Sequence, residues 1–220
     1  LAQGGLAAAW GAACAYFSPR DLETMGLPAS EMHESYRLVT DRIGVSGPTA
    51  PFPSIQPAVP LNDAAKRLMD QSLRCASSLS SLGVSLFQPH SAILTRPLAD
   101  RLPNPLHDMD YYSDPERSVY RPQYTLEFLL KHPRFSYASS LVVESIDDQV
   151  NCSTVHTHSL DSARVRRSFS ARTVILAAGA INTARILLRS RGLIGQSIPF
   201  VTKPHTYLAC VHLDSLFRKP

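Results

Sequence analysis

Residues 174–190 read Val174-Ile-Leu-Ala-Ala-Gly-Ala-Ile-Asn-Thr-Ala-Arg-Ile-Leu-Leu-Arg-Ser190 and join a wholly apolar run to a glycine and an amphipathic segment. The run 174–178 shows no polar alternation, which predicts a short strand buried on both faces of an α/β sheet. After Gly179 the spacing becomes helical. One side of this predicted helix carries Ile181, Ala184, Leu187 and Leu188, and the other carries Asn182, Arg185 and Arg189. We therefore expect the apolar side to pack on the sheet.

Gly179 marks the junction between the predicted strand and the predicted helix. Because glycine has no Cβ, backbone or ligand can approach the carboxyl end of the strand, where open α/β sheets bind ligands. The unpaired amides of a helix N-terminus favour anionic groups at the same place. A strand-to-helix turn that simply requires a glycine explains the residue equally well. The segment alone therefore leaves both interpretations open.

Three parts of the chain resemble glucose-methanol-choline type flavoprotein oxidoreductases. Residues 174–190 resemble the segment in which a strand ending in Ala-Ala-Gly leads to a helix that begins near the flavin. The opening Gln3-Gly-Gly-Leu-Ala-Ala-Ala-Trp-Gly11 is similar to the family's Gly-Gly segment beside the flavin. Residues 120–126 and 135–146 are similar to the stretch that enters the cofactor domain and passes the adenine. The order and spacing of these parts cover most of the chain.

The resemblance implies an FAD cofactor and the oxidation of a small alcohol or sugar-like substrate, with hydride passing from the alcohol carbon to the flavin. It leaves the electron acceptor open. The residues implied to lie near the flavin are Gly4, Gly5, Leu6, Trp10 and Gly11. Those implied to contact the adenosine end are Val143, through its main-chain N–H and C=O, and Ala178, Gly179 and Ala180. This interpretation requires that residues 174–178 be buried and that no protein fill the space above Gly179.

Two features of the family are missing from these 220 residues. No Gly-x-Gly-x-x-Gly turn occurs, although the family begins with one. In the family, the catalytic His and its His or Asn partner lie near the carboxyl terminus of the full-length chain. That position is well beyond any segment that residues 203–207 resemble. We therefore predict no catalytic residue, and expect an internal portion of a longer protein, or a truncated gene product, that is inactive alone. The alternative is a non-catalytic binding or scaffolding domain that retains a flavoprotein-like core.

The expected fold is α/β or α+β, a partial doubly wound FAD/NAD(P)-binding fold with an antiparallel β-meander and a Pro-rich excursion on the substrate side. Runs at 141–147, 150–158 and 163–170, separated by turn residues, predict the meander. Four regions are expected along the chain. They are a flavin-proximal loop and helix segment (1–47), a Pro-rich and helical substrate-side region (48–122), a portion of the FAD-binding domain (123–195) and the start of the substrate domain (196–220).

Helical spacing also predicts three helices before the meander. The first runs from about residue 28 to Ile43 and ends at Gly44. The second runs from an Asn62 cap to residue 82, and its expected buried stripe is Ala65, Leu68, Met69, Leu73, Ala76 and Leu79. A short third helix is expected at 124–131. Two short strands are expected at 84–87 and 135–138.

Composition argues against several classes of function. The net charge is +4, from 22 basic and 18 acidic residues, and the basic clusters lack the interleaved aromatics of a nucleic-acid-binding surface. The four cysteines show no zinc or Cys-x-x-Cys spacing, and His156 and His158 lack a third ligand, so no metal site is predicted. No apolar run approaches the length of about 20 residues that spans a bilayer. No Gly-x-Ser-x-Gly motif of a hydrolase occurs.

Overall fold

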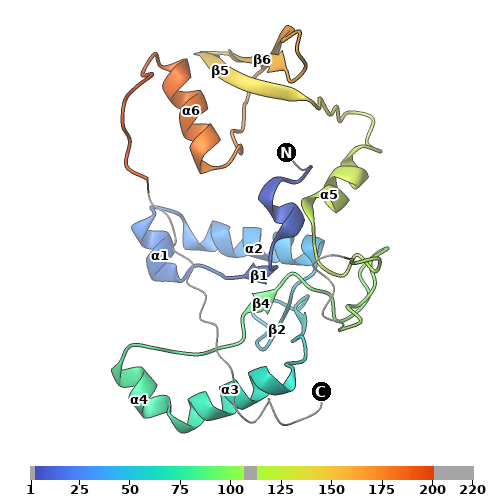
Figure 1. The fold of residues 1–220 in the computed structure, drawn as a ribbon, viewed down its shortest axis with the longest axis vertical. Coiled ribbons are helices and arrows are strands. Elements are labelled where there is room, and N and C mark those ends of the chain that lie inside the picture. Colours follow the sequence, from blue (N-terminus) through green and yellow to red (C-terminus); the bar gives the residue numbers. More distant parts are fainter. Residues whose placement is uncertain (1–2, 107–112, 201–220) are drawn as a thin grey trace. The chain divides into compact units, whose positions relative to one another are not determined.

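The computed structural model describes residues 3–106 and 113–200. Within these residues the chain has mixed α/β structure, with six α-helices, one 3₁₀ helix and two small open sheets (Figure 1). The expected α/β class is confirmed at this level. The described residues up to 136 form one compact unit, and those from 137 onward form a second. Each unit is described by itself.

Short helices make up much of the first unit. They are η1 (Gly5–Ala9), α1 (Pro19–Thr24), α2 (Ala29–Ile43), α3 (Asp63–Arg74), α4 (Ala76–Ser81) and α5 (Pro122–Leu129). The helices predicted at 28–43 and 124–131 are confirmed by α2 and α5. Gly44 ends α2 with φ 73°, and a Cβ at this position would overlap the Leu94 side chain. Only glycine therefore fits the end of this helix.

The second predicted helix begins as expected but is interrupted. The Asn62 side chain accepts a hydrogen bond from the Ala65 amide at 2.9 Å, which caps α3. Cys75 leaves the helical region at φ −103°, ψ 16°, and this divides α3 from α4. The predicted buried stripe is wrong, because Leu68 is 60% exposed and Leu73 is 71% exposed. Among the described elements α3 packs only against α4, and this contact leaves Leu68 and Leu73 exposed.

A sheet of four two-residue strands holds the middle of the first unit. The strands are β1 (Ala13–Cys14), β4 (His90–Ser91), β2 (Ser46–Gly47) and β3 (Gln56–Pro57), in this spatial order. The pairs β1–β4 and β4–β2 are antiparallel, and β2–β3 is parallel. The strand predicted at 84–87 does not form.

The core of the first unit lies beside this sheet. Ala12, Ala92 and Val119 form its buried cluster, and Trp10 and Tyr120 pack against them. The Trp10 indole Nε1–H donates to the Tyr120 carbonyl oxygen at 2.7 Å. This hydrogen bond joins the start of the described chain to the segment that leads into α5.

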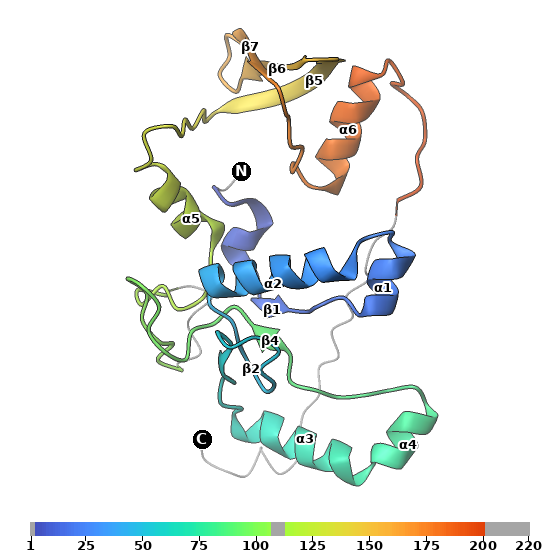
Figure 2. The same ribbon diagram turned by 180° about the vertical axis from the view of Figure 1, so that it is seen from behind.

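The second unit is a three-stranded antiparallel meander with one helix (Figure 2). Its strands are β5 (Leu141–Gln149), β6 (Cys152–Ser159) and β7 (Arg166–Ala171), in the order β5-β6-β7, and its helix is α6 (Ala180–Ser190). The predicted meander is therefore confirmed. A register shift between Val143 and Ser145 marks a β-bulge in β5. The strand predicted at 135–138 does not form.

The buried strand predicted at 174–178 is wrong for this chain. These residues belong to no strand, and Ile175 is 84% exposed. The described chain supplies no parallel neighbour, because β7 ends at Ala171 and pairs antiparallel with β6. A strand of this composition needs partners on both sides to satisfy its amides and to cover its side chains.

The predicted packing side of α6 is also wrong. The helix is buried through Ile186, which is 2% exposed, whereas Ile181 on the predicted side is 72% exposed. Arg185, predicted to face solvent, instead donates from Nη2 to the Val143 carbonyl oxygen at 2.9 Å. The meander therefore occupies the side of α6 opposite to the expected one. Among the described residues no helix or strand packs on the apolar side, which instead borders a hollow that Leu176 and Ile198 also line.

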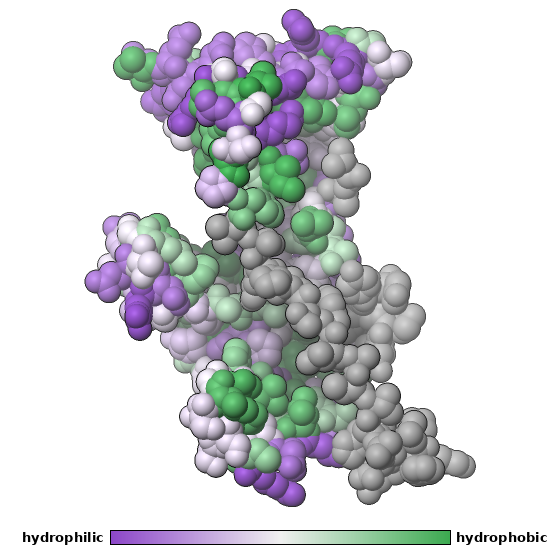
Figure 3. Space-filling model, turned by 60° about the vertical axis from the view of Figure 1, so that its left-hand side comes forward, coloured by the Kyte–Doolittle hydropathy of each residue, from purple (hydrophilic) through white to green (hydrophobic). Residues whose placement is uncertain are grey.

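Large apolar side chains are exposed in both units, and Figure 3 shows them in green among the polar residues of one face. The exposed side chains of the second unit include Ile175, Ile181, Ile194 and Phe200. No helix within residues 3–106 and 113–200 is both long enough and apolar enough to cross a bilayer.

The core position of Leu94 provides a stability test. Leu94 is 0% exposed, whereas Leu73 is 71% exposed. We expect Leu94→Ala to lower the free energy of unfolding by about 2–5 kcal/mol, through lost burial and the cavity that remains. The matched change Leu73→Ala should cost less than about 0.5 kcal/mol. Urea unfolding followed by the fluorescence of Trp10 measures the free energy of unfolding of both variants. Equal losses of stability in the two variants would contradict the assignment of Leu94 to the core.

Candidate functional site

The flavin-proximal candidates of the first unit lie on a loop and short helix, as expected. Gly4 precedes η1 with φ 90°, and Gly5 begins it with φ 61°. A Cβ at Gly4 would lie 3.5 Å from the Pro122 Cβ, in ordinary contact with the start of α5. Leu6 is 96% exposed and contributes nothing to the core.

Two hydrogen bonds fasten this segment to the residues before α5. One is the bond from the Trp10 indole to the Tyr120 carbonyl. In the other, the Arg121 guanidinium donates from Nη1 to the Ala8 carbonyl oxygen at 2.7 Å. The structure thus brings together two of the segments whose sequences resemble the family. No Cβ at Gly5 or Gly11 would meet protein within 4 Å, so the backbone is accessible at both glycines.

Val143, the candidate for the adenine, lies at the β-bulge of β5. Its carbonyl oxygen already accepts the hydrogen bond from Arg185 at 2.9 Å. The neighbouring Ser190 hydroxyl accepts a hydrogen bond from the Ile146 amide at 2.8 Å, which fixes the end of α6 to the same strand. In this chain the main-chain groups of β5 near Val143 therefore serve the contact with α6.

Gly179 has the conformation that the ligand interpretation requires. Its φ of 80° and ψ of 157° lie in a region that is open essentially to glycine alone. Its carbonyl oxygen accepts from the Thr183 amide at 2.9 Å and so begins α6, whose N-terminus has no side-chain cap. A Cβ at Gly179 would meet no atom within 4 Å. Within residues 3–106 and 113–200, no atom therefore occupies the space directly above this residue.

An apolar hollow of about 610 Å³ lies beside Gly179. This volume is within the range of about 300–1,000 Å³ that is typical of small-molecule sites. Its lining residues are Leu176, Ala177, Gly179, Ala180, Thr183, Ala184, Leu187, Leu188 and Ile198. All of them are uncharged, so an anionic group here would meet backbone amides and the helix dipole rather than a basic side chain. The hollow follows the apolar side of α6 that the meander leaves uncovered.

The structure adds one polar cluster that the sequence did not reveal. The His156 ring lies 2.9 Å from Asp147 Oδ2 through Nε2, and 3.1 Å from Ser168 Oγ through Nδ1. Residues of a hydrolytic triad are thus joined across three strands, but Asp147 is 63% exposed and His156 is 37% exposed. A triad needs oxyanion donors and a shielded substrate pocket, and none of the hollows described includes these residues. We interpret the cluster as a cross-strand link.

The two histidines of β6 do not form a metal site with their neighbours. Nδ1 of His158 lies 3.0 Å from Glu144 Oε1, but without the alignment of a hydrogen bond, so the contact becomes an ion pair when the ring is protonated. Within the part of the chain that the structure describes, no three His, Cys, Asp or Glu residues gather as metal ligands would.

Cys14 is the described thiol with the most unusual environment. It is half-buried on β1, and burial raises the pKa of its thiol, although a hydrogen bond involving the Ala92 backbone opposes the shift. A raised pKa reduces the thiolate fraction, which is the reactive form. Cys14 is therefore suited to packing and not to nucleophilic catalysis.

Comparison with protein-family models gives no match, and comparison with curated proteins gives none either.

The thiol environments give a direct chemical test. Cys75 is exposed, whereas Cys14 is half-buried with a raised pKa. At pH 8 we expect iodoacetamide to modify Cys75 several times faster than Cys14, because the buried thiol is less ionised and less accessible. Mass spectrometry of peptides from timed reactions measures the two rates. The difference between the two modification rates should narrow in denaturant. Faster modification of Cys14 than of Cys75 in the native chain would contradict the half-buried position of Cys14.

Proposed function

We propose that this chain is a portion of an FAD-dependent oxidoreductase of the glucose-methanol-choline type, which oxidises an alcohol group by hydride transfer to the flavin. The observation that carries the proposal is the turn at Gly179. The residue adopts a conformation reserved for glycine, lies at the start of an uncapped helix and faces space that no atom of the described residues fills within 4 Å. A glycine turn before an uncapped helix N-terminus is the arrangement that open α/β folds use to bind a nucleotide, although in this chain residues 174–178 before the turn form no strand.

The exposed apolar surface of the second unit supports the idea that a sheet from a larger protein covers it. Residues 174–178 have no strand partner, and no helix or strand of the described chain packs on the adjoining side of α6. Both surfaces would be covered if parallel strands of a larger protein paired with 174–178. Of the two requirements set by the sequence, open space above Gly179 is met, and burial of 174–178 is not met within this chain. The proposal therefore depends on partner strands from outside it.

The proposed roles of the residues concern binding and orientation. The flavin, when bound, would accept the hydride and supply the redox chemistry. The glycines at 4, 5 and 11 would let the backbone approach the ring or the diphosphate, and Gly179 and Ala180 would let the adenosine end cross the strand end. No base that takes the hydroxyl proton is assigned among the described residues. On this proposal the isolated chain binds its cofactor weakly and does not turn over.

A second candidate is a non-catalytic binding or scaffolding domain that retains a flavoprotein-like core. The unpaired segment 174–178 favours it, because Ile175 lies in solvent where the enzyme would have an interior strand. The absence of any shielded reactive cluster among the described residues is compatible with it. The two candidates differ in the flavin content of the complete gene product.

The test uses the complete product of the gene, purified without added cofactor. We expect a flavin absorbance spectrum and a reading frame with an upstream Gly-x-Gly-x-x-Gly turn and a downstream His motif. Gly179→Leu should lose the flavin, because a branched side chain would enter the space above the strand end. Gly192→Leu is the matched control, since Gly192 also has a positive φ of 67° and open space around it.

Thermal unfolding of both variants separates strain from ligand loss. Strain alone would lower the melting temperature of both variants without selective loss of flavin. Absence of flavin from the complete protein would reject the enzyme proposal and favour the scaffolding candidate.

A further inference from the structure

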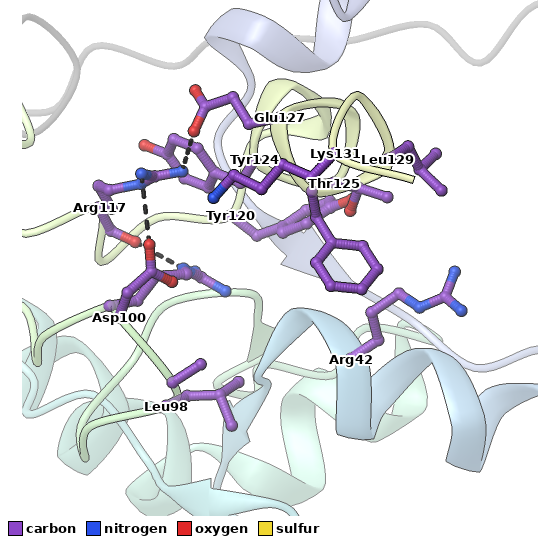
Figure 4. A pocket seen from close by; sticks show the side chains of 13 residues that line it. Arg42, Leu98, Asp100, Arg117, Tyr120, Tyr124, Thr125, Glu127, Leu129 and Lys131 are labelled. Atoms are coloured by element: carbon purple, nitrogen blue, oxygen red, sulfur yellow. Dashed lines mark hydrogen bonds and ion pairs between the residues drawn. The ribbon is translucent and has the colours of Figure 1, made fainter. Parts of the chain in front are cut away.

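A second hollow, of about 640 Å³, lies entirely within the first unit (Figure 4). It is enclosed by the turn 98–101, the residues 117 and 120, helix α5 with Lys131 beyond it, and Arg42 near the end of α2. The apolar part of its wall consists of Leu98, Ala99, Tyr120, Tyr124, Phe128 and Leu129. A volume in the range of about 300–1,000 Å³ with mainly apolar walls and a few polar groups is typical of small-molecule sites.

The wall carries more positive than negative charge. Its cations are Arg42, Arg101, Arg117 and Lys131, and its anions are Asp100 and Glu127. Both carboxylates are engaged by the same arginine: Arg117 lies 3.4 Å from Asp100 and 2.6 Å from Glu127, as the dashed contacts in Figure 4 show. Neither Arg42 nor Lys131 has an ion-pair partner within residues 3–106 and 113–200. Two wall cations therefore remain without an anion from the part of the chain that the structure describes.

Arg101 makes the strongest case for an anion. The residue is 5% exposed, and its guanidinium donates only to carbonyl oxygens: to Ile43 at 2.5 Å, to Arg117 at 2.8 Å and to Ser118 at 3.2 Å. No carboxylate of the described chain lies within ion-pair distance of it, and Asp114 acts on it only from farther away. Burial lowers the pKa of this guanidinium, which expresses the cost of a charge held away from water. A buried cation is normally paired, and a bound anion would supply the missing charge.

Two tyrosine rings flank these cations. The Arg101 guanidinium carbon lies 5.6 Å from the Tyr120 ring centre and 5.5 Å from that of Tyr124. The Arg117 guanidinium carbon lies 4.2 Å from the Tyr124 ring centre, and its buried Nε has no hydrogen-bond partner. The wall thus combines fixed cations, a spare donor and flat apolar surface.

The backbone at the same hollow adopts uncommon conformations. Ala99 has φ 53° and Arg117 has φ 56°, although neither is glycine. Such residues are costly and gather at ligand sites, where the surrounding structure holds them in place. Here each of the two lines the hollow.

We propose that this hollow binds a small organic anion, a molecule with one carboxylate or phosphate group on an apolar body. The acidic group lies among Arg42, Arg101 and Lys131, and the apolar body lies against the tyrosines and Phe128. This binding does not depend on the flavin, so it stands or fails separately from the oxidoreductase proposal.

Trp10 provides the readout. It is the only tryptophan of the chain, and its indole donates to the carbonyl of Tyr120, whose side chain lines the hollow. The probes are cyclohexanecarboxylate and cyclohexyl phosphate, which do not absorb where tryptophan does. Cyclohexylmethanol supplies the apolar body alone, and inorganic phosphate supplies the acidic group alone. The full 220-residue chain is titrated with each, by Trp10 fluorescence and by calorimetry.

We expect both anionic probes to bind with saturation, and the alcohol and inorganic phosphate to bind at least about ten-fold more weakly, a difference of about 1.4 kcal/mol. The ratio of the carboxylate and phosphate affinities identifies the preferred acidic group. Binding of the alcohol or of inorganic phosphate as tight as that of the anionic probes would overturn the proposal.

The double variant Arg42→Gln with Lys131→Gln tests the wall cations without disturbing the core, because both side chains are exposed. Each change should weaken binding by about two- to five-fold. The matched control is Arg67→Gln with Arg74→Gln on α3, which removes the same charge away from the hollow and should leave the affinity unchanged. Equal affinities of the wild type and the Arg42/Lys131 variant, or equal losses in both double variants, would overturn the assignment.

Discussion

One buried guanidinium joins the parts of the first unit that the short sheet cannot hold together. Strands of two residues provide few ladder hydrogen bonds. The first unit therefore depends more on hydrogen bonds from side chains to the backbone. Arg101 ties the end of α2, through Ile43, to residues 117 and 118. The Asp114 carboxylate accepts from the amides of Ser118 and Val119, and these two hydrogen bonds also hold the same segment. Replacing these bonds with water would release the segment from which α5 begins.

Sequence patterns predicted those elements whose causes are local. The meander follows from turn residues and alternating runs, and α2 and the start of α3 follow from Gly44 and Asn62. The strand at 174–178 and the packing side of α6 were wrong, because both require a neighbouring sheet that these residues do not provide. An apolar run predicts burial only when something is present to bury it. Amphipathic spacing shows that a helix has an apolar side, but not what will cover it.

The two candidate sites differ in the same way, because one could be predicted from local sequence and the other could not. Gly179 could be singled out from sequence, because a glycine between an apolar run and a helix has a conformational reason to be there. The hollow around Arg101 could not be predicted. Its cations come from α2, from the turn 98–101, from residue 117 and from Lys131 beyond α5, and only the fold brings them together. The link from Asp147 through His156 to Ser168 depends likewise on strand register.

Strand β7 has a consequence for how copies of the chain meet. Its residues are all exposed, and it forms a free edge of the meander that begins with Arg166 and Arg167. A second copy that added its own β7 there in parallel and in register would bring guanidinium groups of like charge together, which opposes this form of edge-to-edge growth. The segment 174–178 has no such charge on it. Exposed apolar residues of 174–178, such as Ile175, are therefore the more favourable place for another β-strand to pair with this chain.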